Sequence, residues 1–278
     1  MAQEQIIIEP AKDWKLIDWQ ELRRYRDLFY FLIARDVKVL YKQTILGFGW
    51  AIIRPVLSMI IFTIIFGNLA EIDSDGVPYA IFNYAALVPW LYFSSAMSAA
   101  ALSLVNNSDM LTKIYFPRLA FPVTAVIAKL VDFFISFALI FVLMAWFRIV
   151  PTAKVLFIPL LVILLVAFTM GVGLWFAAMA VQYRDVKHAL PFLTQIMMYA
   201  APVVWPASLI QERFGDLGRL LFGLYPMVGI IEGFRACLLN TTPIPWDLLA
   251  IGTVSTSIIL ASGLIYFRRM EAVFADVV

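Results

Sequence analysis

The sequence has almost none of the side chains that hold metals or form nucleophile–base pairs. Its 278 residues include one histidine, His188, and one cysteine, Cys237. A single cysteine excludes an internal disulfide framework, and two isolated residues cannot supply the donors of a zinc-type site. We read His188 as a polar loop residue and Cys237 as a small apolar residue of a helix. The sequence therefore predicts no metal site and no catalytic residue.

Features that bind nucleotides or nucleic acids are also missing. None of the 13 glycines lies in a G-x-x-x-x-G-K-[ST] loop, the motif whose backbone amides hold nucleotide phosphates. We therefore expect this chain to hold no ATP, Mg²⁺ or other cofactor by itself. The net charge of +2 gives no reason to expect a nucleic-acid partner.

Long stretches of the chain carry no charge, which places it in a membrane. Charged residues make up 14% and hydrophobic residues 63%, against about 25% and roughly 45–50% in soluble domains. A helix needs roughly 20 apolar residues to cross the hydrocarbon core, and residues 76–108 and 155–183, for example, contain no Asp, Glu, Lys or Arg. We predict an all-α integral membrane protein with six transmembrane helices. The predicted spans cover residues 50–69, 80–105, 119–147, 156–181, 190–207 and 247–267.

The distribution of Lys and Arg sets the orientation. With the N-terminus inside, fifteen Lys and Arg residues fall in cytoplasmic segments and five in outer segments, as the positive-inside rule requires. Both termini are therefore expected in the cytoplasm. Residues 1–18 are polar, so we expect a cytoplasmic N-terminus without a signal peptide. The first outer loop carries Glu71, Asp73 and Asp75 and no basic residue.

The segment Leu217–Leu239 is apolar but is interrupted by Arg219, Glu232 and Arg235 and split at Tyr225–Pro226. As a seventh span it would place the C-terminal arginines outside. We therefore predict two short re-entrant outer helices between spans 5 and 6, forming a gate over residues 215–240. Glu232 and Arg235 are spaced for an i,i+3 contact, and both arginines are expected on the outer side.

An amphipathic basic helix is predicted before the first span, within residues 19–45, ahead of a single six-span domain over residues 46–278. Apolar residues recur there at three- and four-residue steps, and basic residues occupy the other faces. Such a helix lies along an anionic cytoplasmic leaflet and contacts membrane lipids. It either serves only as an anchor or also contacts a cytoplasmic partner.

Lys129 and Asp132 are the charges that lie deep within a predicted span, three residues apart on one helical face. They either neutralise each other at a helix interface or contact a substrate. The predicted spans otherwise contain few of the acidic and histidine residues that form proton relays in proton-coupled carriers. The sequence therefore predicts a transport pathway without its own energy source.

Three predicted cytoplasmic segments carry a family resemblance. They read RDVKVLYKQTILGFGWAIIRP (35–55), NNSDMLTKIYFPRLAFP (106–122) and QYRDVKHALPF (182–192). In this order and spacing they resemble the membrane subunits of ABC polysaccharide exporters, the type-2 permeases that export O-antigen, capsule or teichoic acid. The match is nearest to O-antigen/lipopolysaccharide permeases and extends over nearly the whole chain.

The resemblance implies a multi-pass subunit of the bacterial cytoplasmic (inner) membrane. It would form a homodimer around a central channel, above two copies of a separate ABC ATP-binding subunit that holds ATP and Mg²⁺. The cargo would be a glycan or glycolipid, in particular lipid-linked O-antigen. An exporter of a small lipid or drug, a stand-alone secondary carrier and a membrane-embedded enzyme are the alternatives.

The resemblance also assigns roles to residues. Asn107–Arg118 and Tyr183–Leu190 would be coupling helices, and Thr44–Gly49 a tight loop into span 1. At the outer gate this chain has Tyr225 before Pro226, where many relatives have Asn. The residues implied in ATPase coupling are Asn107, Asp109, Lys113, Arg118, Arg184, Asp185 and Lys187. Those of the interfacial helix and the loop after it are Arg35, Lys38, Lys42, Leu46 and Gly47. Those of the outer gate are Tyr225, Pro226, Glu232 and Arg235.

Aromatic residues make up 15% of the chain. Sugar C–H faces stack on aromatic rings, which suits the modest, repeated contacts of a glycan channel; anchoring at the membrane interface or core packing is the alternative. The candidate translocation-path residues are Phe62, Phe66, Trp90, Tyr92, Phe93, Tyr199 and Trp205.

Overall fold

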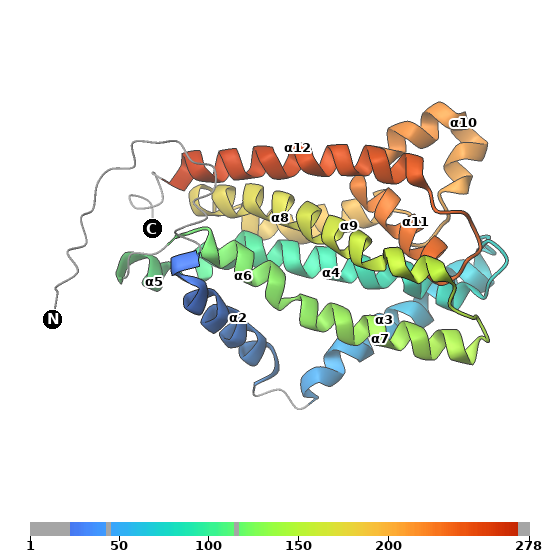
Figure 1. The fold of residues 1–278 in the computed structure, drawn as a ribbon, viewed down its shortest axis with the longest axis horizontal. Coiled ribbons are helices and arrows are strands. Elements are labelled where there is room, and N and C mark those ends of the chain that lie inside the picture. The colour runs from blue at the N-terminus through green and yellow to red at the C-terminus, as the bar shows by residue number, and fades with distance from the viewer. Residues whose placement is uncertain (1–22, 43–45, 114–116, 272–278) are drawn as a thin grey trace.

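The computed structural model describes residues 23–42, 46–113 and 117–271, and within these ranges every regular element is helical. The helices run along one long axis, with α2 and α5 at one end and the bend between α10 and α11 near the other (Figure 1). The predicted all-α membrane fold is confirmed. Residues 19–22 and 43–45 of the predicted interfacial helix lie outside the described residues.

The interfacial helix is present as α2 (Arg26–Tyr41), which packs against α6. Leu32 is fully buried in a small core shared with Leu104, Phe121 and Phe267. The exposed residues of α2 include the charged Arg26, Asp27 and Lys38, but also Tyr30, Phe31 and Val39. The buried apolar face matches the predicted amphipathic pattern, whereas the exposed side is polar only in part.

Five helical segments of the described residues are long and apolar enough to cross a membrane. They correspond to predicted spans 1, 2, 3, 4 and 6. The first joins η1 (Gly47–Gly49), α3 (Trp50–Phe62) and the π-helical η2 (Thr63–Leu69), and the second is α4 (Tyr79–Asn106). The third joins α6 (Ala120–Ala128) to α7 (Leu130–Trp146), the fourth joins η3 (Ala153–Phe157) to α8 (Ile158–Gln182), and the last is α12 (Trp246–Glu271).

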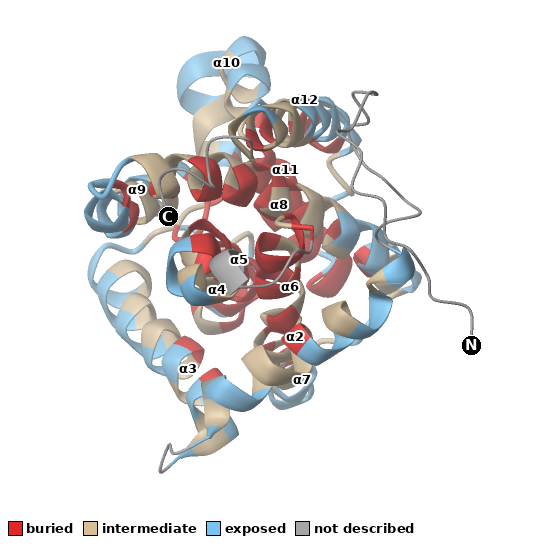
Figure 2. Cartoon of the chain, turned by 90° about the vertical axis from the view of Figure 1, so that its left-hand side faces the viewer, coloured by how far each residue is buried: buried red, intermediate tan, exposed pale blue. Residues whose placement is uncertain are grey.

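Helix α4 is the centre of the bundle: most of its residues are buried, and it contacts α3, α6, α7, α8 and α11 (Figure 2). Small residues let α8 and α12 approach closely beside it. A Cβ added at Gly171 would lie 2.8 Å from the backbone of Leu260, and one added at Gly263 would lie 2.5 Å from the carbonyl oxygen of Gly171. Van der Waals packing of small residues is the usual source of helix association in lipid.

The fifth predicted span, 190–207, is wrong in its bounds. Helix α9 covers Val186–Ala200, which is 15 residues or about 22 Å, too short to cross the hydrocarbon core alone. Residues 201–207 are irregular and include Pro202 and Pro206, which lack the amide hydrogen that a continuing helix needs. The coupling helix predicted over 183–190 is helical from Val186 and continues directly into α9, so it begins later than predicted.

The re-entrant element consists of α10 (Ser208–Gly223) and α11 (Pro226–Leu238), whose axes differ by 106°. The predicted split at Tyr225–Pro226 is confirmed. The first helix starts at Ser208 rather than near residue 215, and Gly215 kinks it with a φ of 68°. Helix α10 is largely exposed, whereas every residue of α11 is buried (Figure 2).

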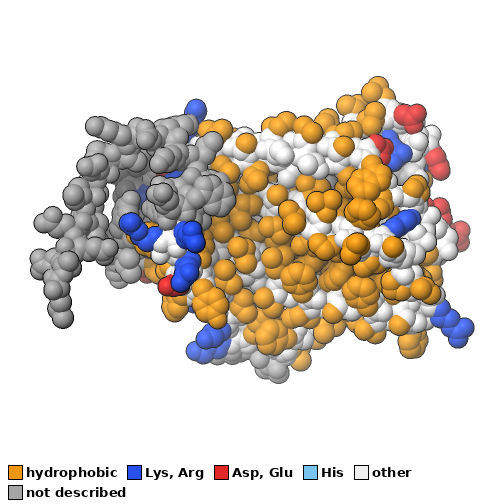
Figure 3. Space-filling model, viewed as in Figure 1, with side chains coloured by type: hydrophobic (Ala, Val, Ile, Leu, Met, Phe, Trp, Pro, Cys, Tyr) orange, Lys and Arg blue, Asp and Glu red, His pale blue; other side chains and the backbone are white. Residues whose placement is uncertain are grey.

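Charges gather at the two ends of the molecule. In Figure 3 a broad band of hydrophobic side chains separates an end where Lys and Arg predominate, near α2 and α5, from an end where most Asp and Glu lie. Glu71, Asp73 and Asp75 follow η2 at this second end. The pattern is that of a bilayer-spanning protein with its charged residues gathered at the two ends.

Candidate functional site

The predicted first coupling segment forms a short helix, α5 (Ser108–Lys113), directly after α4. The Asn107 side-chain amide donates to the carbonyl of Ser103, 2.7 Å away, at the end of α4. Asp109 is exposed in the first turn of α5. The side chain of Lys113 lies outside the described residues.

Two contacts tie α5 and the chain after it to the rest of the bundle. The Arg35 guanidinium of α2 pairs with Asp36 at 2.8 Å and donates to the Met110 sulfur of α5 at 3.4 Å. Arg118 donates to the backbone carbonyl of Glu271 at the end of α12. The first contact joins α2 to α5, and the second joins the chain after α5 to the end of α12.

The second predicted coupling segment presents Arg184, Asp185, Lys187 and His188, all exposed. Arg184 and Asp185 form no ion pair with each other within the described structure. The Asp185 carbonyl accepts the amide hydrogens of His188 and Ala189 at the start of α9. His188 thus lies in the first turn of a helix rather than in a loop.

Lys42 and Leu46, which flank residues 43–45 of the loop into span 1, are exposed, and Gly47 has a φ of +48°. Left-handed backbone is readily adopted by glycine and is strained for most other residues. Gly47 therefore lets the chain turn sharply into α3.

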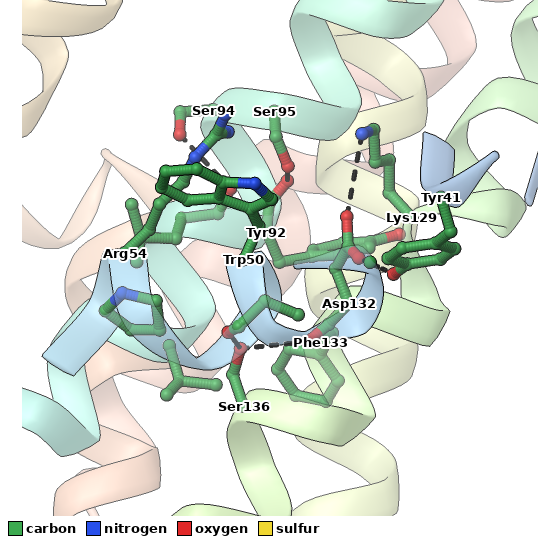
Figure 4. Close-up of a pocket in the computed structure, with 15 residues that line it drawn as sticks. Tyr41, Trp50, Arg54, Tyr92, Ser94, Ser95, Lys129, Asp132, Phe133 and Ser136 are labelled. Atoms are coloured by element: carbon green, nitrogen blue, oxygen red, sulfur yellow. Dashed lines mark hydrogen bonds and ion pairs between the residues drawn. The ribbon is translucent and has the colours of Figure 1, made fainter. Parts of the chain in front are cut away.

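A cavity of about 380 Å³ lies between α3, α4 and α7, with Tyr41 of α2 at its edge (Figure 4). The sequence analysis singled out Gly47, Tyr92 and the Lys129–Asp132 pair for different reasons, and the structure brings them together around this cavity. Its lining residues are Tyr41, Gly47, Trp50, Ala51, Arg54, Pro55, Val88, Leu91, Tyr92, Ser94, Ser95, Lys129, Asp132, Phe133 and Ser136.

Asp132 is the hub of the polar groups in this cavity. Its carboxylate lies 3.6 Å from the Lys129 ammonium and accepts a hydrogen bond from the Tyr41 hydroxyl (Figure 4). The predicted contact between Lys129 and Asp132 is confirmed, although the helix breaks at Lys129, between α6 and α7. Burial, together with the Asp132 carboxylate, raises the pKa of Tyr41. Tyr41 is therefore a neutral donor that ties α2 to span 3.

The outer gate is organised by Arg235, which is 1% exposed. It pairs with Glu232 at 2.9 Å, as predicted, and donates to the carbonyls of Val203, Trp205 and Phe82 at 3.0, 3.3 and 3.3 Å. Its guanidinium also lies over the Phe82 ring. Arg235 is buried because it binds these carbonyls, and its position on the outer side of the membrane stays a prediction. Arg219 remains at the surface, where it pairs with Asp247.

The carbonyls that Arg235 satisfies belong mainly to the irregular segment 201–207. Tyr79 and Asn83 of α4 donate to the carbonyls of Val204 and Val203, and the Glu232 carboxylate accepts the amide hydrogen of Ala207 at 3.1 Å. Irregular backbone at membrane depth requires such partners. The sequence signal was available in Pro202 and Pro206, which have no amide hydrogen and so indicate that a regular helix does not continue here. Cys237 is fully buried in α11, as its apolar reading predicts.

Residues 27–239, which extend from α2 to the end of α11, match the ABC-2 type transporter family. The chain belongs to the ABC-2 type transporter family. It is 30% identical over 253 residues to the O-antigen export system permease protein RfbA of Myxococcus xanthus, covering 91% of this chain and 96% of that protein. A protein of the same name from Klebsiella pneumoniae is 25% identical, covering 90% and 95%. The polysialic acid transport protein KpsM of Escherichia coli is 22% identical, covering 86% and 92%.

This ABC-2 transporter chain contains all three segments that carried the family resemblance within the matched range, and the resemblance is confirmed. The aromatic residues proposed for a translocation path occupy different environments. Trp90 and Phe93 are buried in the core, and Phe93 stacks on Phe168 at 4.9 Å. Both rings pack against side chains of the same chain, and their role in a translocation path stays a prediction.

Tyr92 is buried at the wall of the cavity, and the other candidates lie nearer the surface. Tyr199 is 58% exposed on α9. Phe62 and Phe66 form an edge-to-face pair on span 1, and Trp205 packs beside Phe222 of α10. Tyr225, the residue that departs from the family pattern, donates from its hydroxyl to the Met197 carbonyl at 3.3 Å. Tyr225 therefore joins the bend of the gate to α9.

Replacing Asp75 with asparagine is expected to stabilise the ABC-2 transporter chain at neutral pH. Burial raises the pKa of Asp75; nearby Arg235 lowers it and Asp73 raises it further. Burial favours the protonated form of Asp75, so protonation of this residue stabilises the folded state. This stabilisation is fully present below the pKa of Asp75 in the unfolded chain, about 3.9, and is lost as pH rises through the raised pKa of Asp75 in the folded chain. In detergent, the unfolding temperature of Asp75→Asn should be higher than that of the wild type at pH 7, and the difference should become smaller toward pH 4.

Asp73→Asn is the matched control, since it removes one negative charge from an exposed position in the same loop. If both variants shift the unfolding temperature equally at pH 7, burial of Asp75 has no energetic consequence.

Proposed function

We propose that this chain is the transmembrane subunit of an ATP-driven ABC exporter that moves a polysaccharide across the bacterial cytoplasmic membrane. The glycan is O-antigen or a similar cell-surface polymer, linked to a lipid. The observation that carries this proposal is the alignment over about nine-tenths of both chains with proteins named for O-antigen export. The more distant likeness to a polysialic acid transport protein supports polysaccharide as the cargo class.

Energy comes from a separate ABC ATP-binding subunit, two copies of which hold ATP and Mg²⁺ beneath a homodimer of this chain. The absent phosphate loop supports a separate ATPase. The docking surface is the basic end, where α5 and the start of α9 present Asp109, Arg184 and Lys187. The positive-inside rule supports a cytoplasmic position for this end and for both termini.

The isolated chain is expected to hydrolyse no ATP, whereas its complex with the ATP-binding subunit shows Mg²⁺-dependent turnover. Proteoliposomes that hold the complex should accumulate lipid-linked glycan in an ATP-dependent manner, measured with a fluorescently labelled glycan. The control is the complex with a catalytically inactive ATP-binding subunit. Turnover by the purified chain alone would contradict the proposal. Transport of the lipid carrier without glycan, but not of the glycolipid, would favour a small-lipid exporter.

A further inference from the structure

Arg54 is an unusual residue for a membrane span. It lies in α3, one turn after Trp50, and its side chain is exposed. Within the described residues it forms no hydrogen bond or ion pair, and its guanidinium lies 5.8 Å from the centre of the Trp50 ring. A charge in a span is costly to hold there and generally has a partner or a function.

The cavity around Arg54 has more positive than negative charge. It contains Arg54 and Lys129 as cations and one carboxylate, Asp132, which is already shared between Lys129 and Tyr41. In Figure 4 the Arg54 guanidinium lies on the Ser94 side of the cavity and Lys129 on the Tyr41 side. The net charge of the lining favours an anion, and the guanidinium fork matches the geometry of phosphate oxygens.

The remaining surroundings suit the boundary between headgroups and hydrocarbon. Tyr41 and Gly47 place one edge of the cavity at the basic end of the bundle, where α2 meets α3. Beyond Arg54, the same span exposes Leu57, Ile60 and Ile61. A ligand with a phosphate head and a hydrocarbon tail would fit both the cationic cavity and these exposed apolar side chains, with its head at Arg54 and its tail along α3. The volume of about 380 Å³ lies in the usual range of small-molecule sites, roughly 300–1,000 Å³.

We propose that this cavity binds the phosphate headgroup of a lipid, with Arg54 as the main contact and Lys129 as the second cation. Binding of a phosphate-headed lipid stands on the cavity alone. Its assignment as the site for the exported glycan's lipid anchor rests on the proposed function. Loading would then begin beside α2, where Tyr41 already reaches Asp132.

The test measures lipid binding to the full-length chain in phosphatidylcholine nanodiscs by native mass spectrometry. The probes are a long-chain polyprenyl diphosphate, the uncharged polyprenol of the same length and phosphatidylglycerol. Arg54→Gln should weaken diphosphate-lipid binding roughly tenfold or more, because it removes a charge-assisted contact. Arg54→Lys should restore part of the affinity. Arg24→Gln, which removes an exposed positive charge on the N-terminal side of α2, should leave binding unchanged.

Each outcome separates the alternatives. Preference for the polyprenyl diphosphate, lost in Arg54→Gln, supports a site for the substrate's anchor. Equal binding of phosphatidylglycerol, lost in the same variant, supports the phosphate site but assigns it to a membrane lipid. Equal binding of polyprenol, or no effect of Arg54→Gln, overturns the proposal. Because ATP-dependent glycan transport is assayed separately, failure of the lipid site is distinguishable from failure of the proposed function.

Discussion

Replacing Arg235 with methionine is expected to lower the free energy of unfolding by about 3–5 kcal/mol, because it leaves the Glu232 carboxylate buried without its ion-pair partner. The same change removes the donor for the Val203 and Trp205 carbonyls of the irregular segment. The substitution is therefore expected to lower global stability and also to loosen the packing around the irregular segment. Thermal unfolding in detergent measures the first, and reaction of Cys237 with a membrane-impermeant thiol reagent measures the second.

Cys237 is a suitable reporter because it is fully buried in the same helix as Arg235. The wild-type protein should react slowly, and Arg235→Met should react faster at temperatures below its unfolding transition. The paired variant Glu232→Gln with Arg235→Met should recover part of the stability, since it leaves no unpaired charge.

The matched control for Arg235 is Arg219→Met, which breaks the surface pair with Asp247 at 3.1 Å. A surface ion pair contributes roughly 0–1 kcal/mol, so this variant should unfold close to wild type. If Arg235→Met unfolds no earlier than Arg219→Met, then Arg235 does not hold the irregular segment in place.

Reversing the charge of Asp109 is expected to reduce ATP-dependent glycan transport roughly tenfold or more while leaving the chain folded. Asp109 is exposed in the first turn of α5, where Asp109→Lys would oppose a complementary charge on the ATP-binding subunit. Like charges at an interface cost several kcal/mol, and each 1.4 kcal/mol is about tenfold in affinity. Co-purification of the ATP-binding subunit and transport into proteoliposomes are the two measurements.

Asp73→Lys is the control, because it makes the same substitution at an exposed site at the opposite end of the bundle. Arg118 is a poorer probe than Asp109, since it also donates to the Glu271 carbonyl and its loss would disturb the end of α12. Full transport by Asp109→Lys with the ATP-binding subunit still bound would remove α5 from the coupling surface.

The spans themselves followed from the sequence because their cause is local. A run such as 155–183 lacks every charged residue, and lipid accepts such a run only as a helix with its backbone bonded internally. The structure accordingly has α8 over Ile158–Gln182. The Glu232–Arg235 contact was predictable for the same reason, since i,i+3 spacing on one helix fixes the distance whatever surrounds it.

The family resemblance was predictable as well, because motifs such as residues 35–55 are read directly from the order of residues. The end of α9 at Ala200 was only partly visible in Pro202 and Pro206. A proline removes one donor, but whether the helix ends there also depends on what satisfies the carbonyls of the irregular segment that follows. Here Asn83 and Arg235, more than 100 residues before and about 30 residues after them, do so.

The sequence by itself determined the all-helical membrane class, most of the spans, the family and the pairing of charges along a helix, because these depend on neighbours within a few residues. Tertiary structure alone decided that Arg235 lies inside, that Trp90 and Phe93 pack within the core, and that Arg54, Lys129 and Tyr41 share one cavity. These facts depend on which helix faces meet. One-sided periodicity cannot fix those faces in α4, which is apolar all round and buried on most sides.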